Sequence, residues 1–200
     1  MKKVGIVGIG DMGSGLAKNL IKNGFSVIGL DLLEHRNVAF EAMGGRLASD
    51  YAEIGRASDA VFVMVMNGTQ AKEIILGENG LLASMEKGGT ILLTATIKPT
   101  EAREIGAAMA GSGIDLIDSP VSGGFPGAQG GSLTLMVAAP DDILAKNRRV
   151  MEAVSKTIHH VGSDAGMGQT VKACLQSLIC LLYTSPSPRD RSLSRMPSSA

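Results

Sequence analysis

The chain has few cysteines, no excess of either charge and no long hydrophobic run, and each shortage excludes a class of protein. Its two cysteines, Cys174 and Cys180, are too few for a disulfide framework and lack metal-ligand spacing, which favours a reducing compartment and no metal site. We expect Cys174 to be a buried small apolar residue. Lys plus Arg and Asp plus Glu both number 19, so no global field attracts nucleic acid or an anionic membrane.

The apolar runs are short. The run from Ala60 to Met66 is far shorter than the roughly 20 residues that span a bilayer, and no signal-peptide pattern precedes the apolar run that begins at Val4. We therefore expect a cytoplasmic protein with no nucleic-acid or membrane partner. Hydrophobic residues still make up 44% of the 200, which is enough to bury the core of one domain, or of one domain and part of another.

Strand-like and helix-like segments alternate along the chain, a pattern typical of a parallel sheet covered by helices on both faces. The expected fold class is therefore α/β, a Rossmann-type doubly wound and mostly parallel sheet. Apolar runs predict strands over residues 4–9, 26–30, 60–66, 90–94, 114–118, 132–138 and 157–161. Helices are predicted over residues 12–22, 34–43, 51–56, 70–75, 99–110, 141–154 and 166–179. The segment 122–131 holds five glycines among its ten residues and predicts a backbone-lined loop.

Three glycines at the end of the first apolar run, Gly8, Gly10 and Gly13, have the spacing G-x-G-x-x-G. Gly8 allows a tight turn from strand to helix, Gly10 lets the backbone approach a pyrophosphate, and Gly13 lets the helix pack closely on the strand. Asp31 follows 18 positions after Gly13, where a carboxylate can accept both ribose hydroxyls and repel a 2′-phosphate. The sequence therefore predicts an NAD site, with NADP less favoured. A glycine-rich turn that only caps a βαβ unit would not account for Asp31.

Four ordered blocks resemble the β-hydroxyacid dehydrogenase family, whose members include 3-hydroxyisobutyrate, tartronate-semialdehyde and L-threonate enzymes. The blocks are Gly8-Ile-Gly-Asp-Met-Gly13, Thr94-Ala-Thr-Ile-Lys-Pro99, Asp118-Ser-Pro-Val-Ser-Gly-Gly124 and Gly166-Met-Gly-Gln-Thr-Val-Lys172. The resemblance runs from the first strand to about Ile179. It implies NAD- or NADP-linked oxidation of a hydroxyl group on a small carboxylic acid.

The resemblance also implies roles for individual residues. The cofactor contacts besides Asp31 would be Gly8, Gly10, Asp11, Met12, Gly13, Met66 and Thr96, with Thr96 near the nicotinamide ribose. The substrate contacts would be Ser122, Gly123, Gly124 and Gln176, and the catalytic residue would be Lys172.

The chemistry of Lys172 fits that role. Oxidation of an alcohol needs a group that removes the hydroxyl proton while the cofactor accepts the hydride. A lysine can do so when burial and a cationic nicotinamide lower its pKa. The Ser122 hydroxyl and the bare N–H groups of Gly123 and Gly124 can donate to a substrate carboxylate. The alternatives are a solvated surface lysine and a glycine-rich hairpin that only turns. His159 and His160 are neighbours on an expected strand and so face opposite sides, which disfavours a general-base role for them.

Two departures bear on the substrate. Gln176 stands where most of the family has Asn, and the segment from Met66 to Gln70 lacks a proline that many members carry. Both features resemble the L-threonate branch, so the substrate would be L-threonate-like or 3-hydroxyisobutyrate-like. The alternatives are a tartronate-semialdehyde-type reductase using NAD(P)H and a dinucleotide-binding fragment without turnover.

The expected domain plan has three parts. Residues 1–164 form the NAD-binding domain, residues 165–179 begin the helix that leads into an all-α second domain missing from this chain, and residues 180–200 form a disordered tail. That tail has six serines, three prolines and three arginines. Its start, Cys180 to Asp190, resembles a translated sequencing adapter, which favours an artefact over a natural disordered tail. We expect this polypeptide alone to be inactive and its full-length parent to be a homo-oligomer.

Overall fold

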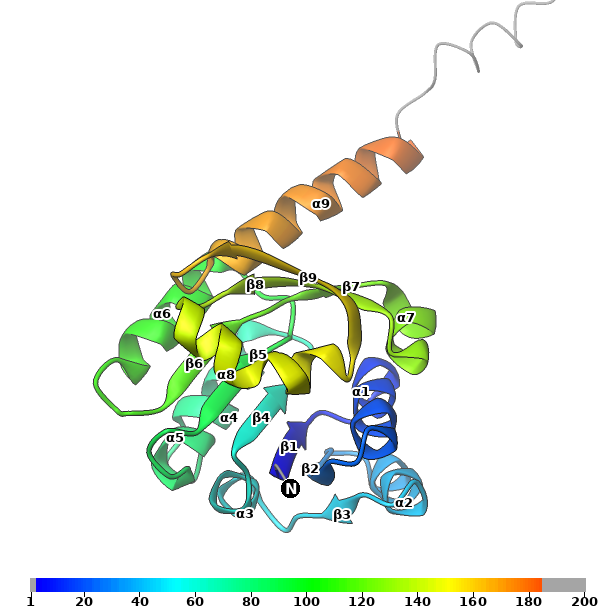
Figure 1. The fold of residues 1–200 in the computed structure, drawn as a ribbon, viewed down its shortest axis with the longest axis vertical. Coiled ribbons are helices and arrows are strands. Elements are labelled where there is room, and N and C mark those ends of the chain that lie inside the picture. Colours follow the sequence, from blue (N-terminus) through cyan, green and yellow to red (C-terminus); the bar gives the residue numbers. More distant parts are fainter. Residues whose placement is uncertain (1–2, 185–200) are drawn as a thin grey trace, which may run out of the picture.

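The computed structural model describes residues 3–184. In this part of the chain nine strands form one sheet, and helices cover both of its faces (Figure 1). The strands are β1 (Lys3–Val7), β2 (Ser26–Leu30), β3 (Arg46–Leu47), β4 (Ala60–Val63), β5 (Thr90–Leu93), β6 (Asp115–Asp118), β7 (Val121–Ser122), β8 (Leu133–Ala138) and β9 (Ser155–Gly162). The helices are α1 (Asp11–Lys22), α2 (Glu34–Ala42), α3 (Tyr51–Ala57), α4 (Gly68–Leu76), α5 (Leu81–Ser84), α6 (Pro99–Met109), α7 (Gly124–Gly130), α8 (Asp141–Glu152) and α9 (Met167–Thr184).

The strand order along the sheet is β3-β2-β1-β4-β5-β6-β8-β7, with β9 paired to β8. All pairs from β3 to β6 are parallel, which confirms the expected doubly wound α/β class. The order reverses between β1 and β4, and ligands bind at such a switch point, outside the carboxyl ends of the strands. Strand β8 meets β6 in antiparallel fashion through Ala138 opposite Asp118. Strands β7, β8 and β9 thereby continue the sheet beyond β6, and in Figure 1 they lie above β1 and β4.

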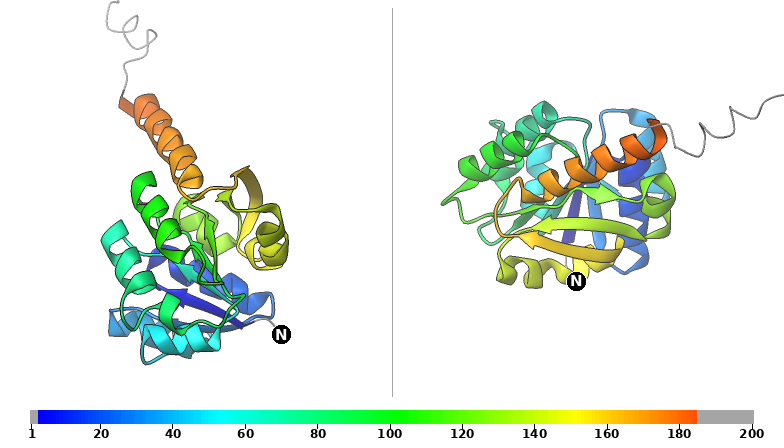
Figure 2. Two further views of the ribbon diagram at one scale, coloured as in Figure 1. Left: turned by 90° about the vertical axis from the view of Figure 1, so that its left-hand side faces the viewer. Right: turned by 90° about the horizontal axis from the view of Figure 1, so that it is seen from above.

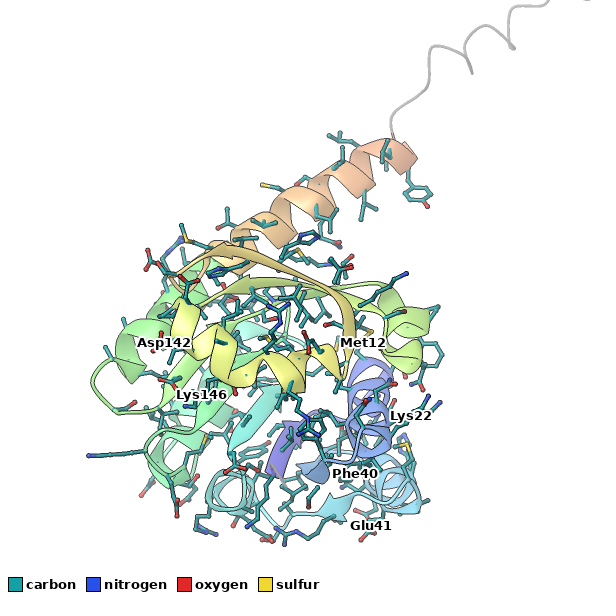
Figure 3. All side chains as sticks on the ribbon, viewed as in Figure 1. Met12, Lys22, Phe40, Glu41, Asp142 and Lys146 are labelled. Atoms are coloured by element: carbon teal, nitrogen blue, oxygen red, sulfur yellow. The ribbon has the colours of Figure 1, made fainter. Side chains whose placement is uncertain are left out.

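Two apolar clusters, one on each face, hold the layers together. Alternate residues of β4 serve the two faces: Phe62 belongs to one cluster with Leu16 of α1 and Phe40 of α2, whereas Val61 belongs to the other with Ile54 of α3. Of these side chains, Phe40 is labelled in Figure 3. Burial of each such side chain contributes about 1.5–3 kcal/mol, so β4 anchors the domain from both sides.

The structure corrects the expected loop over residues 122–131. Residues Gly124–Gly130 form helix α7. The turn before it uses positive φ angles at Gly123 (125°) and Gly124 (58°), a region that glycine reaches without steric cost. The Gly127 N–H then donates to the Gly123 carbonyl oxygen (3.1 Å). Glycine disfavours a helix interior, and packing against α1 overrides that preference here.

The last helix also differs from expectation. Helix α9 begins at Met167 and continues to Thr184, five residues beyond the predicted end at Ile179. It projects from the domain in the left-hand view of Figure 2, and its buried residues are Gly168, Gln169 and Lys172. The prediction that Cys174 is buried was wrong, because its side chain lies on the exposed stretch of this helix. Residues 185–200 of the expected tail lie outside the described residues.

Candidate functional site

The glycine turn between β1 and α1 has the close contacts that the motif predicts. A Cβ atom on Gly8, whose φ is +88°, would lie 2.2 Å from the Met64 carbonyl oxygen, and one on Gly13 would lie 1.9 Å from the Gly8 carbonyl oxygen. Neither position can therefore hold a side chain. The N–H groups of Asp11 and Met12, the first two residues of α1, lack partners within the helix and present its positive dipole end. This cradle fits a pyrophosphate.

Asp31 lies beside that turn at the end of β2. Its carboxylate accepts from the backbone N–H of Ile9 (2.7 Å) and of Leu33 (3.0 Å). The Arg36 guanidinium lies 3.5 Å from the same carboxylate and also borders Gly10, where an added Cβ would be 3.2 Å from Nη1. The Asp31 side chain is only 7% exposed, so it also anchors the glycine turn. Sequence reasoning missed Arg36, which reaches this carboxylate from the first turns of α2.

The loops after β4 and β5 bring Met66 and Thr96 to the same carboxyl edge of the sheet. Both side chains are exposed, that of Met66 to 86%. Their neighbours Thr94 and Ala95 are buried, and the Thr94 hydroxyl donates to the Val63 carbonyl oxygen (3.0 Å). The buried residues Thr94 and Ala95 thus fix the loop after β5, while the Thr96 side chain stays accessible.

The segment with Ser122, Gly123 and Gly124 is tied to the nucleotide helix α1. Buried Asn19 of α1 donates from Nδ2 to the Ala128 carbonyl oxygen of α7 (2.9 Å). Gly15 lies against the same residue, because an added Cβ would be 2.5 Å from the Ala128 carbonyl carbon. Ser122 is partly buried, whereas Gly123 and Gly124 are exposed. The structure therefore joins the predicted substrate segment to the predicted cofactor helix, a link that sequence reasoning missed.

Lys172 lies on the first half of α9. It is the only buried lysine among residues 3–184, with 8% of its surface exposed. Burial lowers the pKa of its amine, because a charged group loses hydration in an apolar environment. No hydrogen bond or ion pair of this amine occurs within the described chain. Gln176 lies one turn further on the same helix face and is exposed.

The start of α9 is held by two buried polar residues that sequence reasoning did not assign. The Asp118 carboxylate, at the end of β6, accepts from the N–H groups of Gly166 (2.8 Å) and Gln169 (3.2 Å) and from Gln169 Nε2 (2.9 Å). Burial raises the pKa of Asp118, while the hydrogen bonds from Gln169 and Gly166 oppose that rise. Both residues belong to quoted motif blocks, so the signal was present without a role attached.

His159 and His160, for which a general-base role is disfavoured, both lie on β9. His160 Nε2 donates to the Ala139 carbonyl oxygen (2.8 Å), and His159 is exposed on β9. Within residues 3–184 no helix combines the length and the apolar character needed to cross a membrane. That same part of the chain brings no three His, Cys, Asp or Glu side chains together as a metal would require.

Comparison with known domains agrees with this geometry. The NAD binding domain of 6-phosphogluconate dehydrogenase describes a domain family whose sequence pattern matches residues 3–162. The chain belongs to this family. Its NAD-binding domain thus accounts for the glycine turn, the switch point and the placement of Asp31, and NAD is confirmed as the cofactor type. The contacts of individual residues with it stay predictions.

Relatives of this domain confirm the resemblance to β-hydroxyacid dehydrogenases. The L-threonate dehydrogenase of Escherichia coli O6:H1 is 36% identical over 176 residues, a match that covers 88% of this chain and 58% of that enzyme. The NAD-dependent L-serine dehydrogenase of Pseudomonas aeruginosa is 36% identical over 182 residues, covering 91% and 61%. Among solved structures, a 3-hydroxyisobutyrate dehydrogenase of Mycobacterium tuberculosis, described together with L-serine, is similar with a TM-score of 0.85 and 29% identity, covering 90% and 61%. The chain thus spans about three fifths of the length of these relatives.

Proposed function

We propose that this chain is the NAD-binding part of a dehydrogenase that oxidises the hydroxyl group of a small hydroxy acid, with Lys172 as the general acid/base. The observation that carries the proposal is the burial of Lys172 on α9, which packs against β6 and β8 at the carboxyl edge of the sheet. A lysine is almost never fully buried unless it is paired, and the Lys172 amine has no partner among the described residues, which leaves it available to a substrate hydroxyl. The named relatives act on acids that bear hydroxyl groups, in agreement with this chemistry.

The residues divide the work as follows. Bound NAD would supply the hydride acceptor. The glycine turn and the α1 N-terminus would hold its pyrophosphate, Asp31 would accept from the adenosine ribose, and Thr96 would contact the nicotinamide ribose. Neutral Lys172 would take the proton of the substrate hydroxyl at Nζ, and the ammonium form would return it in the reverse direction.

The substrate carboxylate would lie at Ser122, Gly123 and Gly124. The Ser122 hydroxyl and the N–H groups of the two glycines are donors suited to its two oxygens, and the exposure of both glycines leaves them accessible. Gln176, on the Lys172 face of α9, would contact further oxygens of the acid. A longer amide in place of Asn suits a polyhydroxylated acid, so an L-threonate-like substrate ranks before a 3-hydroxyisobutyrate-like one.

We also propose that a second domain completes the site in the full-length protein. Every residue of α9 after Lys172 is exposed or partly exposed, and water at Lys172 would weaken the desolvation that lowers its pKa. The 200-residue chain alone should therefore bind nucleotide without appreciable turnover. A tartronate-semialdehyde-type reductase would use the same residues in the reductive direction. The homo-oligomeric state and the cytoplasmic location of the parent stay predictions.

The test is Lys172→Ala in the complete dehydrogenase that contains this domain. Loss of a positioned acid/base group lowers kcat by about 10²–10⁴-fold, while the Kd for NAD stays near its original value. Lys156→Ala, which removes an exposed lysine on β9, is the matched control and should leave both quantities unchanged. Turnover of Lys172→Ala near the level of the control would contradict the proposed role.

A further inference from the structure

Gln169 is a buried residue of α9 whose side chain bonds only to other parts of the protein, and the proposed function gives it no role. Its side chain is 1% exposed. Its Oε1 accepts from the Ile97 N–H (3.0 Å), and its Nε2 donates both to the Ala95 carbonyl oxygen (3.0 Å) and to Asp118 (2.9 Å). One amide therefore joins three segments that lie far apart in the sequence.

Two of these bonds flank Thr96. The amide holds the carbonyl oxygen of the residue before Thr96 and the N–H of the residue after it, much as a neighbouring strand would. Ala95 and Ile97 are buried, whereas Thr96 is exposed. The grip of Gln169 thus fixes the backbone that presents the Thr96 side chain to the carboxyl edge.

The third bond fixes the helix that carries Lys172. Positions i and i+3 of a helix lie on one face, so Gln169 is directly below Lys172 on α9. Asp118 adds two backbone hydrogen bonds to the same turn, from Gly166 and from Gln169. Gly168 packs without a side chain against the Asp118 carbonyl oxygen, since an added Cβ would lie 2.8 Å from it. The depth and the rotation of Lys172 are set at this point.

We propose that Gln169 is a positioning residue that holds the Thr96 loop and the Lys172 helix as one unit. It rests on the proposed function in taking Lys172 as the acid/base group and Thr96 as a contact of the nicotinamide ribose. Asp118 and Ile97 fix the orientation of the Gln169 amide. An ionised carboxylate only accepts hydrogen bonds and a backbone N–H only donates, so the amide must direct its Nε2 toward Asp118 and its Oε1 toward Ile97.

The experiment uses Gln169→Met in the 200-residue chain, with Thr170→Val as the matched control. Thr170 lies on the same turn and donates only locally, to the Gly166 carbonyl oxygen (2.7 Å). NAD and ADP are titrated in parallel, because ADP reports the adenosine half of the site and not the Thr96 loop. For Gln169→Met we expect the Kd for NAD to rise about tenfold, the effect of a misplaced hydrogen bond, with the Kd for ADP unchanged. Thr170→Val should leave both values unchanged.

The second readout is the titration of Lys172, followed by NMR of isotopically labelled lysine. In Gln169→Met the pKa of Lys172 should move up toward the ordinary lysine value, because a loosened helix start exposes Nζ to water. Unchanged titration, or equal losses of NAD and ADP affinity, would show that Gln169 serves the fold alone. These readouts do not depend on turnover, so they stand apart from the kcat test of Lys172→Ala.

If Gln169→Met does not fold, Gln169→Glu keeps the inference testable. A protonated glutamic acid has the shape of glutamine and can donate to Asp118, whereas an ionised one repels it. The charged groups around this position are Asp118 on β6, Arg103 on α6, which borders Gly166, and Lys172 on α9. Burial beside the Asp118 carboxylate raises the pKa of this glutamic acid above its usual value of about 4.3. The ratio of NAD to ADP affinity should therefore be close to that of the original chain at about pH 5 and lower at about pH 8. A ratio equal to the original at both pH values would overturn the proposal.

Discussion

At the scale of single residues, the burial that suits Lys172 to acid/base chemistry also lowers the stability of the folded domain while the amine is charged. Its folded-state pKa lies below the unfolded value of about 10.4, because burial lowers it. Between those two pKa values the unfolded chain binds more protons, so stability rises with pH across that window. Below the folded-state pKa the destabilisation by the buried charge is fully present.

Replacement of this lysine by an uncharged side chain of similar size should therefore stabilise the domain. Lys172→Met should have a higher free energy of unfolding than the original chain at pH 7, and the gain should shrink as the pH approaches about 10.4. Urea denaturation at several pH values measures it, with Lys156→Met as the exposed control. A gain no larger than that of the control would show that Lys172 does not strain the fold.

Asp31 gives a second prediction at this scale. The original chain should bind NADH more tightly than NADPH, because the carboxylate accepts from the ribose diol and repels a 2′-phosphate. Asp31→Asn should narrow that preference by about one to a few kcal/mol, the usual contribution of a hydrogen bond to a charged group. Fluorescence titration of both cofactors measures the difference. The control is Asp50→Asn at the α3 N-cap, which accepts from the Glu53 N–H and should leave the preference unchanged. NADPH binding as tight as NADH binding in the original chain would refute the argument.

At the scale of elements, the contact between α1 and α7 ties the cofactor helix to the substrate segment. Gly15→Ala would place a Cβ 2.5 Å from the Ala128 carbonyl carbon, and main-chain atoms there cannot give way without shifting α7. Such overpacking costs about 1–3 kcal/mol of stability, measurable by urea denaturation. Gly130→Ala on α7 is the control, because its Cβ would meet only the Ser132 hydroxyl at 3.5 Å. Similar stability of both variants would mean that the two helices can separate without loss.

Hydrophobic periodicity was sufficient to predict the main elements, and it failed where long-range contacts decide. The runs around Val27 and Phe62 are apolar enough to mark buried strands unaided. Strand β3 has two residues and helix α5 four, too few for any period to show. Helix α7 was missed because its glycines favour a loop locally, whereas its packing against α1 at Gly15 is a long-range contact that the local sequence does not show.

In the candidate site, too, the residues with local sequence signals could be predicted and those that depend on long-range contacts could not. Gly8, Gly13 and Asp31 could be predicted because the dinucleotide motif is short and local. The role of Gln169 could not, since its side-chain partners lie 51 to 74 positions away. A glutamine in a helix is most often exposed, and nothing adjacent to it in the sequence shows that this one is buried.

At the scale of the whole molecule, α9 is the exposed part of the fold. Its outer residues include Leu178, Leu181, Leu182 and Tyr183, exposed to between 56% and 88%. Without tertiary contacts a helix end opens readily. Hydrogen exchange of the 200-residue chain should be fast from about Leu175 to Thr184 and slow in β1 and β4. Slow exchange throughout 175–184 in a monomeric sample would mean that contacts of another kind protect this helix.

The anchored start and free length of α9 give it the mechanics of a lever. Its 18 residues extend about 27 Å at 1.5 Å per residue, and its three buried residues all lie within its first six. A tilt of about 10° at that turn would carry the Thr184 end through about 5 Å over the same length. A small change of tilt at the turn that contains Gln169 would therefore produce a larger displacement along α9, in proportion to the distance from that turn.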